Sequence, residues 1–212
     1  MGREWCIGQE AVSEALHTGK PAATDRRPLP SLSHSFTLDL VICCRNKAEE
    51  ASTTMRDMML KLKLTVNEKK TRVCKLPEEK FDFLGYTFGR CYSPTTGQAY
   101  LGTTPSKKWV HRICEAISNE TGRNKLLLAH ETVIATLNRM MIGWANYFCL
   151  GPVSKAYRAI ERHARTRLRQ WLCAKHKLRW PAIKTFPEAA LHDQLGLVRL
   201  TTRTHSFPWA TP

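Results

Sequence analysis

Residues 154–180 read SKAYRAIERHARTRLRQWLCAKHKLRW, a stretch dense in positive charge that carries one acid, Glu161. On a helix that turns about 100° per residue, its apolar side chains fall on one side: Tyr157, Ile160, Ala164, Leu168 and Trp171. Its basic side chains gather roughly opposite: Lys155, Arg158, Arg162, Arg165 and Arg169. The stretch therefore predicts an amphipathic helix with an apolar seam for packing and a basic face for a negatively charged partner.

The shortage of acids decides between a basic face that is only solvated and one that binds a partner. A solvated helix normally mixes both signs of charge, because opposite charges three or four residues apart relieve repulsion. Here Lys175 and Lys177 extend the positive run instead. Residues 1–104 carry 15 Lys or Arg and 12 Asp or Glu, a net charge of +3, whereas residues 105–212 carry 18 and 6, a net charge of +12. The pattern favours contact between the second half of the chain and nucleic-acid phosphates.

The composition is that of a soluble globular protein. The chain has 212 residues, of which 42% are hydrophobic and 24% charged, values typical of folded domains. No stretch approaches the ~18 consecutive apolar residues of a membrane-spanning helix, and the first residues lack the apolar core of a secretory signal. We therefore expect no membrane partner and a cytoplasmic location, and the oligomeric state is left open.

The eight cysteines are scattered without a CxxC pair and are expected to be reduced. Two pairs, His111 with Cys114 and Cys173 with His176, have the two-residue spacing of zinc ligands. Both pairs lie within predicted helices, where residues three apart share a face for packing reasons alone. We therefore expect no metal site and no cofactor.

The first hundred residues predict short strands and one helix, an α+β arrangement. Residues 1–35 are rich in Pro, Ser and Thr from Gly19 onward and predict a loop-rich or disordered arm, with a short helix over 10–16. The elements predicted next are a strand over 36–44, a helix over 47–63, a strand over 71–76, and a β-hairpin with arms 81–88 and 98–101.

After Gly102 the pattern becomes helical. Thr104 as cap and Pro105 as first residue predict a helix ending at Gly122, and this helix turns three residues inward: Trp109, Ile113 and Ile117. A second helix is predicted over 131–149, before the basic one. Three amphipathic helices joined by short loops predict a three-helix bundle over 105–180. The extension over 181–212 is expected to wrap the bundle or fray, with a small strand over 196–200.

Three segments resemble bacterial group II intron reverse transcriptase/maturases: Leu64–Thr71 (LTVNEKKT), Phe81–Phe88 (FDFLGYTF) and Leu137–Phe148 (LNRMMIGWANYF). The basic stretch from Ala156 to His176 is similar to the rest of the maturase-specific region of that family. The resemblance covers about residues 38–180. It implies that residues 36–104 are the remnant of a polymerase palm. It also implies that residues 105–180 are the thumb, called domain X, which grips intron RNA during splicing.

The chain departs from this family at the polymerase site. Intact members carry a Tyr-Ala-Asp-Asp turn where this chain has Phe36-Thr37-Leu38-Asp39. Polymerase chemistry needs Mg²⁺ ions held by carboxylate oxygens, and Leu38 supplies none, so Asp39 is a lone remnant of the pair. The 35 residues before this segment are unlike the family and leave no room for the fingers, so we expect this sequence to lack them. We therefore expect no catalytic residue here, and Mg²⁺ only in an intact family polymerase. The alternatives are a polymerase completed by a second chain, or a remnant without a present role.

The residues predicted to bind structured intron RNA, with DNA as the alternative partner, are cations of the first and last helices: Lys107, Lys108, Arg112, Lys155, Arg158, Arg162, Arg165, Arg169, Lys175 and Lys177. Trp144, Tyr147 and Phe148 have the helical spacing of core residues, which is favoured over a platform for stacking bases. Asn146 is a weaker candidate for hydrogen bonding to RNA. Gly143 is expected to permit close helix packing.

Overall fold

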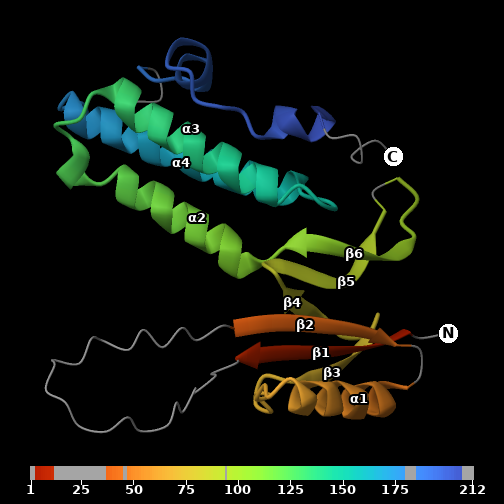
Figure 1. Ribbon diagram of the computed structural model, residues 1–212. Helices are drawn as coiled ribbons and strands as arrows, with labels where there is room; N and C mark the ends of the chain where they lie inside the picture. The colour runs from red at the N-terminus through yellow and green to blue at the C-terminus, as the bar shows by residue number, and fades with distance from the viewer. Residues whose placement is uncertain (1–2, 12–36, 45–46, 94, 180–184, 207–212) are drawn as a thin grey trace, which may run out of the picture. The chain divides into compact units, whose positions relative to one another are not determined.

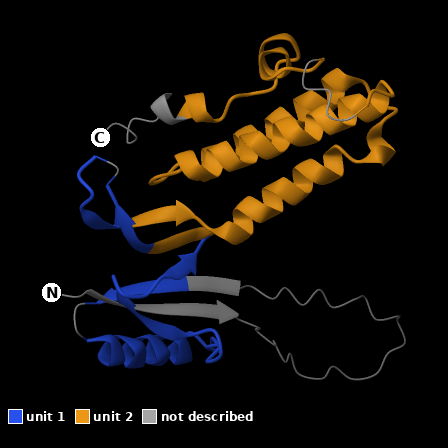
Figure 2. Ribbon diagram, turned by 180° about the vertical axis from the view of Figure 1, so that it is seen from behind, with its two compact units in different colours: residues 1–84, 89–101 blue, residues 85–88, 102–212 orange. Residues whose placement is uncertain are grey.

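The computed structural model describes residues 3–11, 37–44, 47–93, 95–179 and 185–206. The chain divides into two compact units (Figure 2). The sheet unit comprises residues 1–84 and 89–101, and the helical unit comprises residues 85–88 and 102–212. Antiparallel strands and α-helices thus both contribute, as the sequence predicts, and each unit has its own packing.

The sheet unit contains a three-stranded antiparallel sheet, of which β1 is the central strand (Figure 1). Its strands are β1 (Arg3–Ala11), β2 (Thr37–Cys44) and β3 (Arg72–Leu76), in the order β2-β1-β3. Ile7 of β1 pairs with Val41 on one side and with Arg72 on the other. Helix α1 (Ala48–Lys61) packs on β1 and β2 and buries Met55 and Met59. The predicted strand over 36–44 and helix over 47–63 are confirmed.

Strand β1 corrects the prediction for the first residues. A loop-rich arm was expected over 1–35, but residues 3–11 hydrogen-bond to two neighbouring strands. The segment REWCIGQEA mixes polar and apolar residues without clear alternation, so its partners rather than its own pattern make it a strand. The helix expected over 10–16 starts within β1 and is wrong there, and its later part lies outside the described residues.

A second antiparallel sheet has the order β4-β5-β6, with β4 (Phe81–Phe83), β5 (Tyr86–Tyr92) and β6 (Ala99–Pro105). The predicted hairpin is therefore present, but its first arm is interrupted at Leu84-Gly85. Gly85 has φ +84°, a conformation that glycine adopts without steric cost. The boundary between the two units runs across β5 and β6.

Three α-helices pack against one another in the helical unit: α2 (Lys107–Glu120), α3 (His130–Tyr147) and α4 (Ser154–Lys175) (Figure 1). A 3₁₀ turn at Arg123–Lys125 lies between α2 and α3. The chain continues beyond α4 into a short π-helix, η2 (Ala190–Gln194), and a 3₁₀-helix, η3 (Thr201–Ser206). The start of α2 corrects the sequence prediction, because Pro105 ends β6 and Ser106 occupies the N-cap position in place of Thr104.

The apolar seam predicted on the basic helix is confirmed. All five of its residues are at most 1% exposed: Tyr157, Ile160, Ala164, Leu168 and Trp171. The buried Tyr157 hydroxyl donates to the carbonyl oxygens of Ala145 at 2.9 Å and Phe148 at 3.0 Å, which satisfies carbonyls at the end of α3 that have no helical partner. Burial raises the pKa of Tyr157 to about 12, because the charged phenolate loses its hydration.

Three residues of the bundle differ from their predicted placement. Trp144 and Phe148 are buried as expected, but Tyr147 beside them is 54% exposed, so the core interpretation is wrong for Tyr147. Trp109 is 38% exposed and does not join Ile113 and Ile117 in the core. Gly143 does not mark a close helix contact, since a Cβ placed there would meet no atom within 4 Å in the described structure.

The segment after α4 covers the bundle. Leu191, Leu197 and Leu200 are at most 2% exposed within the core of the helical unit. The Asn138 side chain of α3 holds this segment through two hydrogen bonds, to the Gly196 carbonyl at 2.8 Å and from the Val198 amide at 2.9 Å. Of the two outcomes expected for the extension, wrapping or fraying, the described residues 185–206 show wrapping, but the strand predicted over 196–200 does not form.

Candidate nucleic-acid interface

Helices α2 and α4 lie side by side and run in the same direction. His163 of α4 donates through Nε2 to the Cys114 carbonyl at 3.0 Å, and Arg167, one turn further on, donates to the Ser118 carbonyl at 3.0 Å. The contacts therefore advance from N-terminus to C-terminus along both helices, so the two helices are parallel. The first halves of the two helices consequently lie at the same end of the pair.

Six predicted RNA-binding cations are exposed on these first halves: Lys107, Lys108 and Arg112 on α2, and Lys155, Arg158 and Arg162 on α4. We call these six residues the cationic end. Within the part of the chain that the structure describes, none of them forms an ion pair with a carboxylate. Arg158 bonds only the Ser154 carbonyl of its own helix, at 3.3 Å, and Arg112 lies 4.9 Å from the centre of the Trp109 ring. Their charges are therefore available to a ligand.

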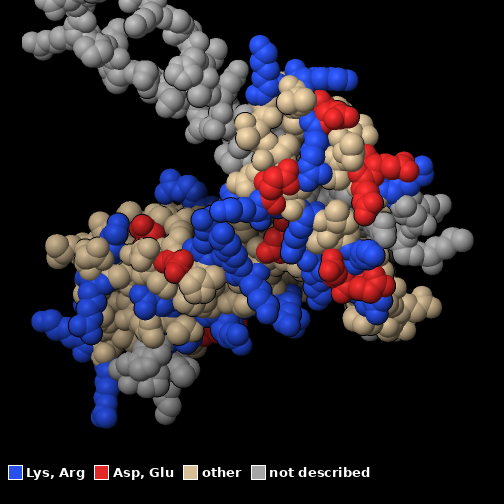
Figure 3. All heavy atoms as spheres, turned by 90° about the horizontal axis from the view of Figure 1, so that it is seen from below, with Lys and Arg blue, Asp and Glu red and all other residues tan. Residues whose placement is uncertain are grey.

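A hollow of about 630 Å³ lies against the α4 part of the cationic end. Four cations line it together with two acids and two small residues: Lys155, Arg158, Arg162, Arg165, Glu161, Glu188, Ala159 and Thr201. Figure 3 shows one face of the molecule, on which Lys and Arg side chains gather over the helical unit with acidic side chains sparse among them. A concave, positively lined surface of this kind raises the local concentration of anions.

The acids of residues 105–212 all contact groups other than the six cations of the cationic end, including Glu161 and Glu188, which share the hollow with three of them. Three face exposed or partly exposed basic groups within the bundle: Glu115 lies 3.4 Å from His111, Glu120 3.5 Å from Lys125, and Glu131 3.2 Å from His130. The other three lie at the segment after α4, where Glu188 contacts Arg165, Asp193 lies 3.0 Å from Arg199, and Glu161 accepts from Thr201.

Three predicted RNA-binding cations are instead occupied by the chain itself. Arg165 pairs with Glu188, and Arg169 donates to the Phe186 carbonyl at 2.9 Å, so both hold the segment after α4. Lys175 donates to the carbonyls of Leu126 and Leu128, at 2.9 and 2.6 Å, and thereby holds the connection between α2 and α3. Arg169 and Lys175 thus satisfy backbone carbonyls and Arg165 a carboxylate, and sequence periodicity could reveal none of these contacts. Lys177, by contrast, is exposed.

Two further residues at the α2–α4 contact are polar and partly buried. Arg167 donates to Ser118 and Thr121 of α2 and is a packing residue rather than a surface cation. Burial lowers the pKa of His163, and the charge of Arg167 lowers it further. The hydrogen bond to the Cys114 carbonyl acts in the opposite direction but does not cancel the effect of burial. The imidazole therefore stays neutral at neutral pH and does not add to the positive surface. Asn146, a weaker candidate for RNA contact, accepts from Arg203 at 3.1 Å.

The structure describes most of the residues that were considered, and set aside, as zinc ligands, and the backbone of the segment that matches the polymerase turn. Cys173 is buried at the end of α4 while His176 is exposed, and His111 pairs with Glu115 rather than with a cysteine. In β2 the backbones of Leu38 and Asp39 pair with Glu10 and Gln9 of β1. Their side chains lie outside what the structure describes, so the role of Asp39 remains a prediction.

Sequence comparison agrees with this helical architecture. Residues 110–186 match the family model of the group II intron maturase-specific domain. Among curated proteins, none matches the chain. Nowhere in the described residues is there a helix of the length and apolar character needed to cross a membrane. The matched region contains most of α2, all of α3 and α4, and four of the six residues of the cationic end. Residues 110–186 of the helical unit are therefore similar to a group II intron maturase-specific domain.

Proposed function

We propose that this protein binds structured group II intron RNA through the cationic end and helps to hold the intron in its splicing-competent fold. The observation that carries the proposal is the set of six exposed cations without acidic partners among the described residues, at one end of the α2–α4 pair. Exposed like charges on a rigid scaffold repel one another, and RNA phosphates remove that cost. The match to the maturase-specific domain supports intron RNA as the partner.

The arrangement suits RNA better than sequence-specific duplex DNA. Structured RNA is recognised mainly through its backbone shape and unpaired loops, and cations on a packed helical bundle present fixed positive charge to a folded backbone. A protein that neutralises six phosphates is expected to lose affinity by on the order of a thousandfold between 50 and 200 mM salt. Such a steep dependence of affinity on salt concentration distinguishes binding through phosphates from binding through apolar contacts.

We further propose that the helical unit serves as a thumb, that the sheet unit contains a palm remnant, and that the chain alone performs no nucleotide chemistry. Leu38 supplies no metal ligand where the related polymerases have an aspartate. Primer extension by the purified chain, with and without a candidate partner chain, checks this part. Incorporation of nucleotides by the chain alone would contradict it, and incorporation only with the partner would support the two-chain polymerase instead.

The binding test compares a group II intron transcript with an unrelated structured RNA at matched salt. Reversing three charges of the cationic end, Lys155→Glu, Arg158→Glu and Arg162→Glu, is expected to weaken intron binding at least a hundredfold. All three side chains are exposed, so the helical circular dichroism signal should persist. We leave Arg165 and Arg169 unchanged, because their substitution would release the segment after α4.

The matched control reverses three exposed cations elsewhere: Lys61→Glu, Arg123→Glu and Arg139→Glu. It changes the net charge by the same amount but leaves the cationic end intact, and its affinity should fall far less. Equal losses in the two variants would show that net charge, not this surface, determines binding. Unchanged binding in the first variant would place the contact elsewhere.

A further inference from the structure

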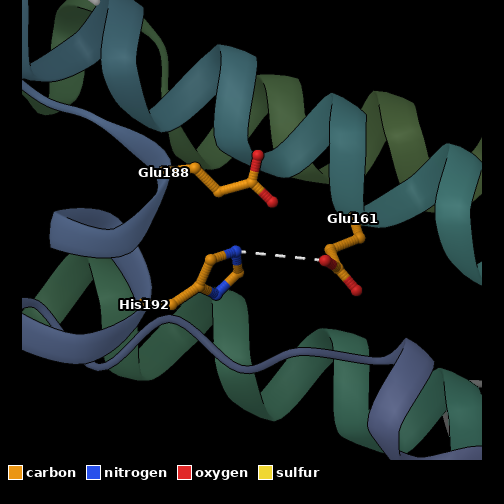
Figure 4. A group of neighbouring side chains, drawn as sticks. All are labelled: Glu161, Glu188 and His192. Atoms are coloured by element: carbon orange, nitrogen blue, oxygen red, sulfur yellow. Dashed lines mark ion pairs between the residues drawn. The ribbon is translucent and has the colours of Figure 1, made fainter. Parts of the chain in front are cut away.

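Three ligand-type side chains converge where the segment after α4 lies on that helix (Figure 4). Glu161 comes from α4, Glu188 lies two residues before η2, and His192 lies within η2. One ligand atom of each lies within 4.8 Å of the corresponding atoms of the other two. His192 Nε2 and Glu161 Oε1 are 3.9 Å apart. None of the three belongs to the cationic end.

The buried imidazole of His192 points its unused nitrogen into this group. The residue is 7% exposed, and its Nδ1 lies 2.7 Å from the Leu197 carbonyl oxygen. A carbonyl only accepts, so Nδ1 carries the proton and a neutral ring presents the Nε2 lone pair. Nε2 has no hydrogen-bond partner among the described residues. Metal-ligating histidines are arranged in this way, with the second nitrogen fixed by a carbonyl.

The Glu161 carboxylate is likewise oriented by its surroundings. Its Oε2 accepts from the Thr201 amide and hydroxyl, both at 3.2 Å, and its Oε1 faces His192. Glu161 is 7% exposed, so the carboxylate lies in a medium where an unneutralised charge is costly. A cation beside Oε1 would satisfy both this carboxylate and the His192 lone pair.

We propose that Glu161, Glu188 and His192 bind one divalent transition-metal ion of the zinc class. Imidazole with carboxylates suits Zn²⁺, whereas Mg²⁺ and Ca²⁺ prefer oxygen ligands alone. Zinc ligands lie about 2.0–2.2 Å from the ion, so the three atoms must approach one another slightly. Glu188 can move, since its side chain is 61% exposed. Water would complete a tetrahedron.

Metal binding would also change the partner of Arg165. The Arg165 guanidinium contacts the Glu188 carboxylate in the structure, and a metal ion at Glu188 replaces that cation. Arg165 already lines the hollow with Lys155, Arg158 and Arg162, so its release adds a fourth cation to that surface. This last consequence rests on the proposed RNA binding. The metal site itself does not depend on it.

The test is a calorimetric titration of the full, metal-free chain with ZnCl₂, without RNA. We expect one site, and at least tenfold weaker binding in Glu188→Gln, which removes a ligand charge at an exposed position but keeps an amide oxygen that can still accept from Arg165. Asp193→Asn is the matched control, because Asp193 is a neighbouring exposed acid that pairs with Arg199; its zinc affinity should equal that of the unchanged chain.

Two spectroscopic readouts locate the ion, because seven described cysteines are free thiols that could also take zinc. The ¹⁵N resonance of His192 Nε2 should shift on zinc addition, and Co²⁺ in place of zinc should show no thiolate charge-transfer band. Absence of stoichiometric zinc binding, equal affinity in Glu188→Gln, an unmoved His192 resonance or a thiolate band would each overturn the proposal. If no stoichiometric zinc binding is found, water is the remaining ligand for Nε2. None of the four outcomes would bear on the proposed RNA binding.

Discussion

Helices α1 and α4 are both amphipathic, but the paired acids near α1 are exposed whereas the acid of α4 is buried. On α1 and its flanks, two exposed acids pair with cations: Glu50 with Lys47 at 2.9 Å, and Glu68 with Arg56 at 2.8 Å. On α4 the lone acid, Glu161, turns inward and accepts from Thr201. The outer face of α1 is therefore internally neutralised, whereas the first half of α4 is not.

This difference shows that the number of charges on a helix says less than where their partners lie. Surface pairs such as those of α1 contribute little to stability, because water and salt screen them. Burying the acid of a basic helix has two effects. The acid can hold another segment in place, and the exposed cations of the helix remain unpaired and can bind an external anion. Glu161 therefore links the stability of the helical unit to its proposed function.

The sharpest test of the comparison is Glu161→Ala against Glu50→Ala. Loss of Glu161 leaves the Thr201 amide and hydroxyl without their acceptor, and we expect the free energy of unfolding to fall by about 2–4 kcal/mol. Loss of Glu50 on the exposed surface should cost less than about 0.5 kcal/mol. Urea unfolding followed by circular dichroism, with EDTA to exclude metal ions, measures both.

The matched control for the larger effect is Glu161→Gln. An amide can still accept from Thr201, so this variant should lose less stability than Glu161→Ala. Similar small losses at Glu50 and Glu161 would remove the distinction between the two helices.

A second difference is that α4 contributes a buried polar anchor, Tyr157, while the buried side chains of α1 are apolar. Tyr157→Phe keeps the ring and removes the hydroxyl that serves the carbonyls of Ala145 and Phe148. We expect a loss of about 1–2 kcal/mol near pH 8. Urea unfolding of the two proteins measures it.

The loss should disappear at high pH. The pKa of Tyr157 is raised to about 12 in the folded chain, whereas an unfolded tyrosine titrates near pH 10. The unfolded chain therefore releases its proton first, and the contribution of Tyr157, complete below pH 10, is lost as the pH rises toward 12. The stability gap to Tyr157→Phe should close over this range. A gap that persists unchanged would show that the hydroxyl is not buried as the structure has it.

The sequence could predict the features that depend on local periodicity. Tyr157, Leu168 and Trp171 recur at helical spacing, and the strand over 36–44 is an apolar run with polar flanks, so both were found. The inward turn of Glu161 could not be predicted, because its partners lie about 30–40 residues later in a segment with no periodic pattern. Strand β1 was missed for the same reason, since its pairing partners β2 and β3 define it.

The candidate interface shows the same division. Exposure of Lys155, Arg158 and Arg162 follows from the wheel of a single helix, and all three are exposed. Occupation of Arg165 and Arg169 depends on where Glu188 and the Phe186 carbonyl lie, which is tertiary information. The one available signal was the isolation of Glu161 among cations. In the structure this single acid has a structural role, because it accepts hydrogen bonds from Thr201.

A smaller effect is expected at His163, the α4 residue that faces α2. Burial lowers the pKa of His163 in the folded chain, so the unfolded chain takes up the proton more readily as the pH falls below about 6.5. The contribution of His163 is present above that pH and is lost on acidification. Urea unfolding at about pH 7.5 and pH 5.5 should therefore show a smaller acid destabilisation for His163→Gln than for the unchanged chain.

His111→Gln is the control for this measurement, because His111 is exposed and pairs with exposed Glu115. Its acid destabilisation should match that of the unchanged chain. An identical pH dependence for all three proteins would mean that His163 is accessible to protons in the folded state, and that the α2–α4 contact is looser than the hydrogen bonds at Cys114 and Ser118 indicate.

The smallest effect on stability is expected at the Arg56–Glu68 pair, which is an example of the exposed ion pairs near α1. Arg56 donates to Glu68 through two nitrogens, at 3.1 and 2.8 Å, and this hydrogen bonding lowers the pKa of Glu68. Both side chains lie in water, however, so solvent screens the interaction in the folded chain. A double-mutant cycle of Arg56→Ala and Glu68→Ala should give a coupling close to the detection limit of urea unfolding, and smaller still in 0.5 M NaCl. A large, salt-insensitive coupling would show that the charge pairs near α1 are structural like Glu161, and the contrast between the two helices would then lie only in the sign of the exposed charge.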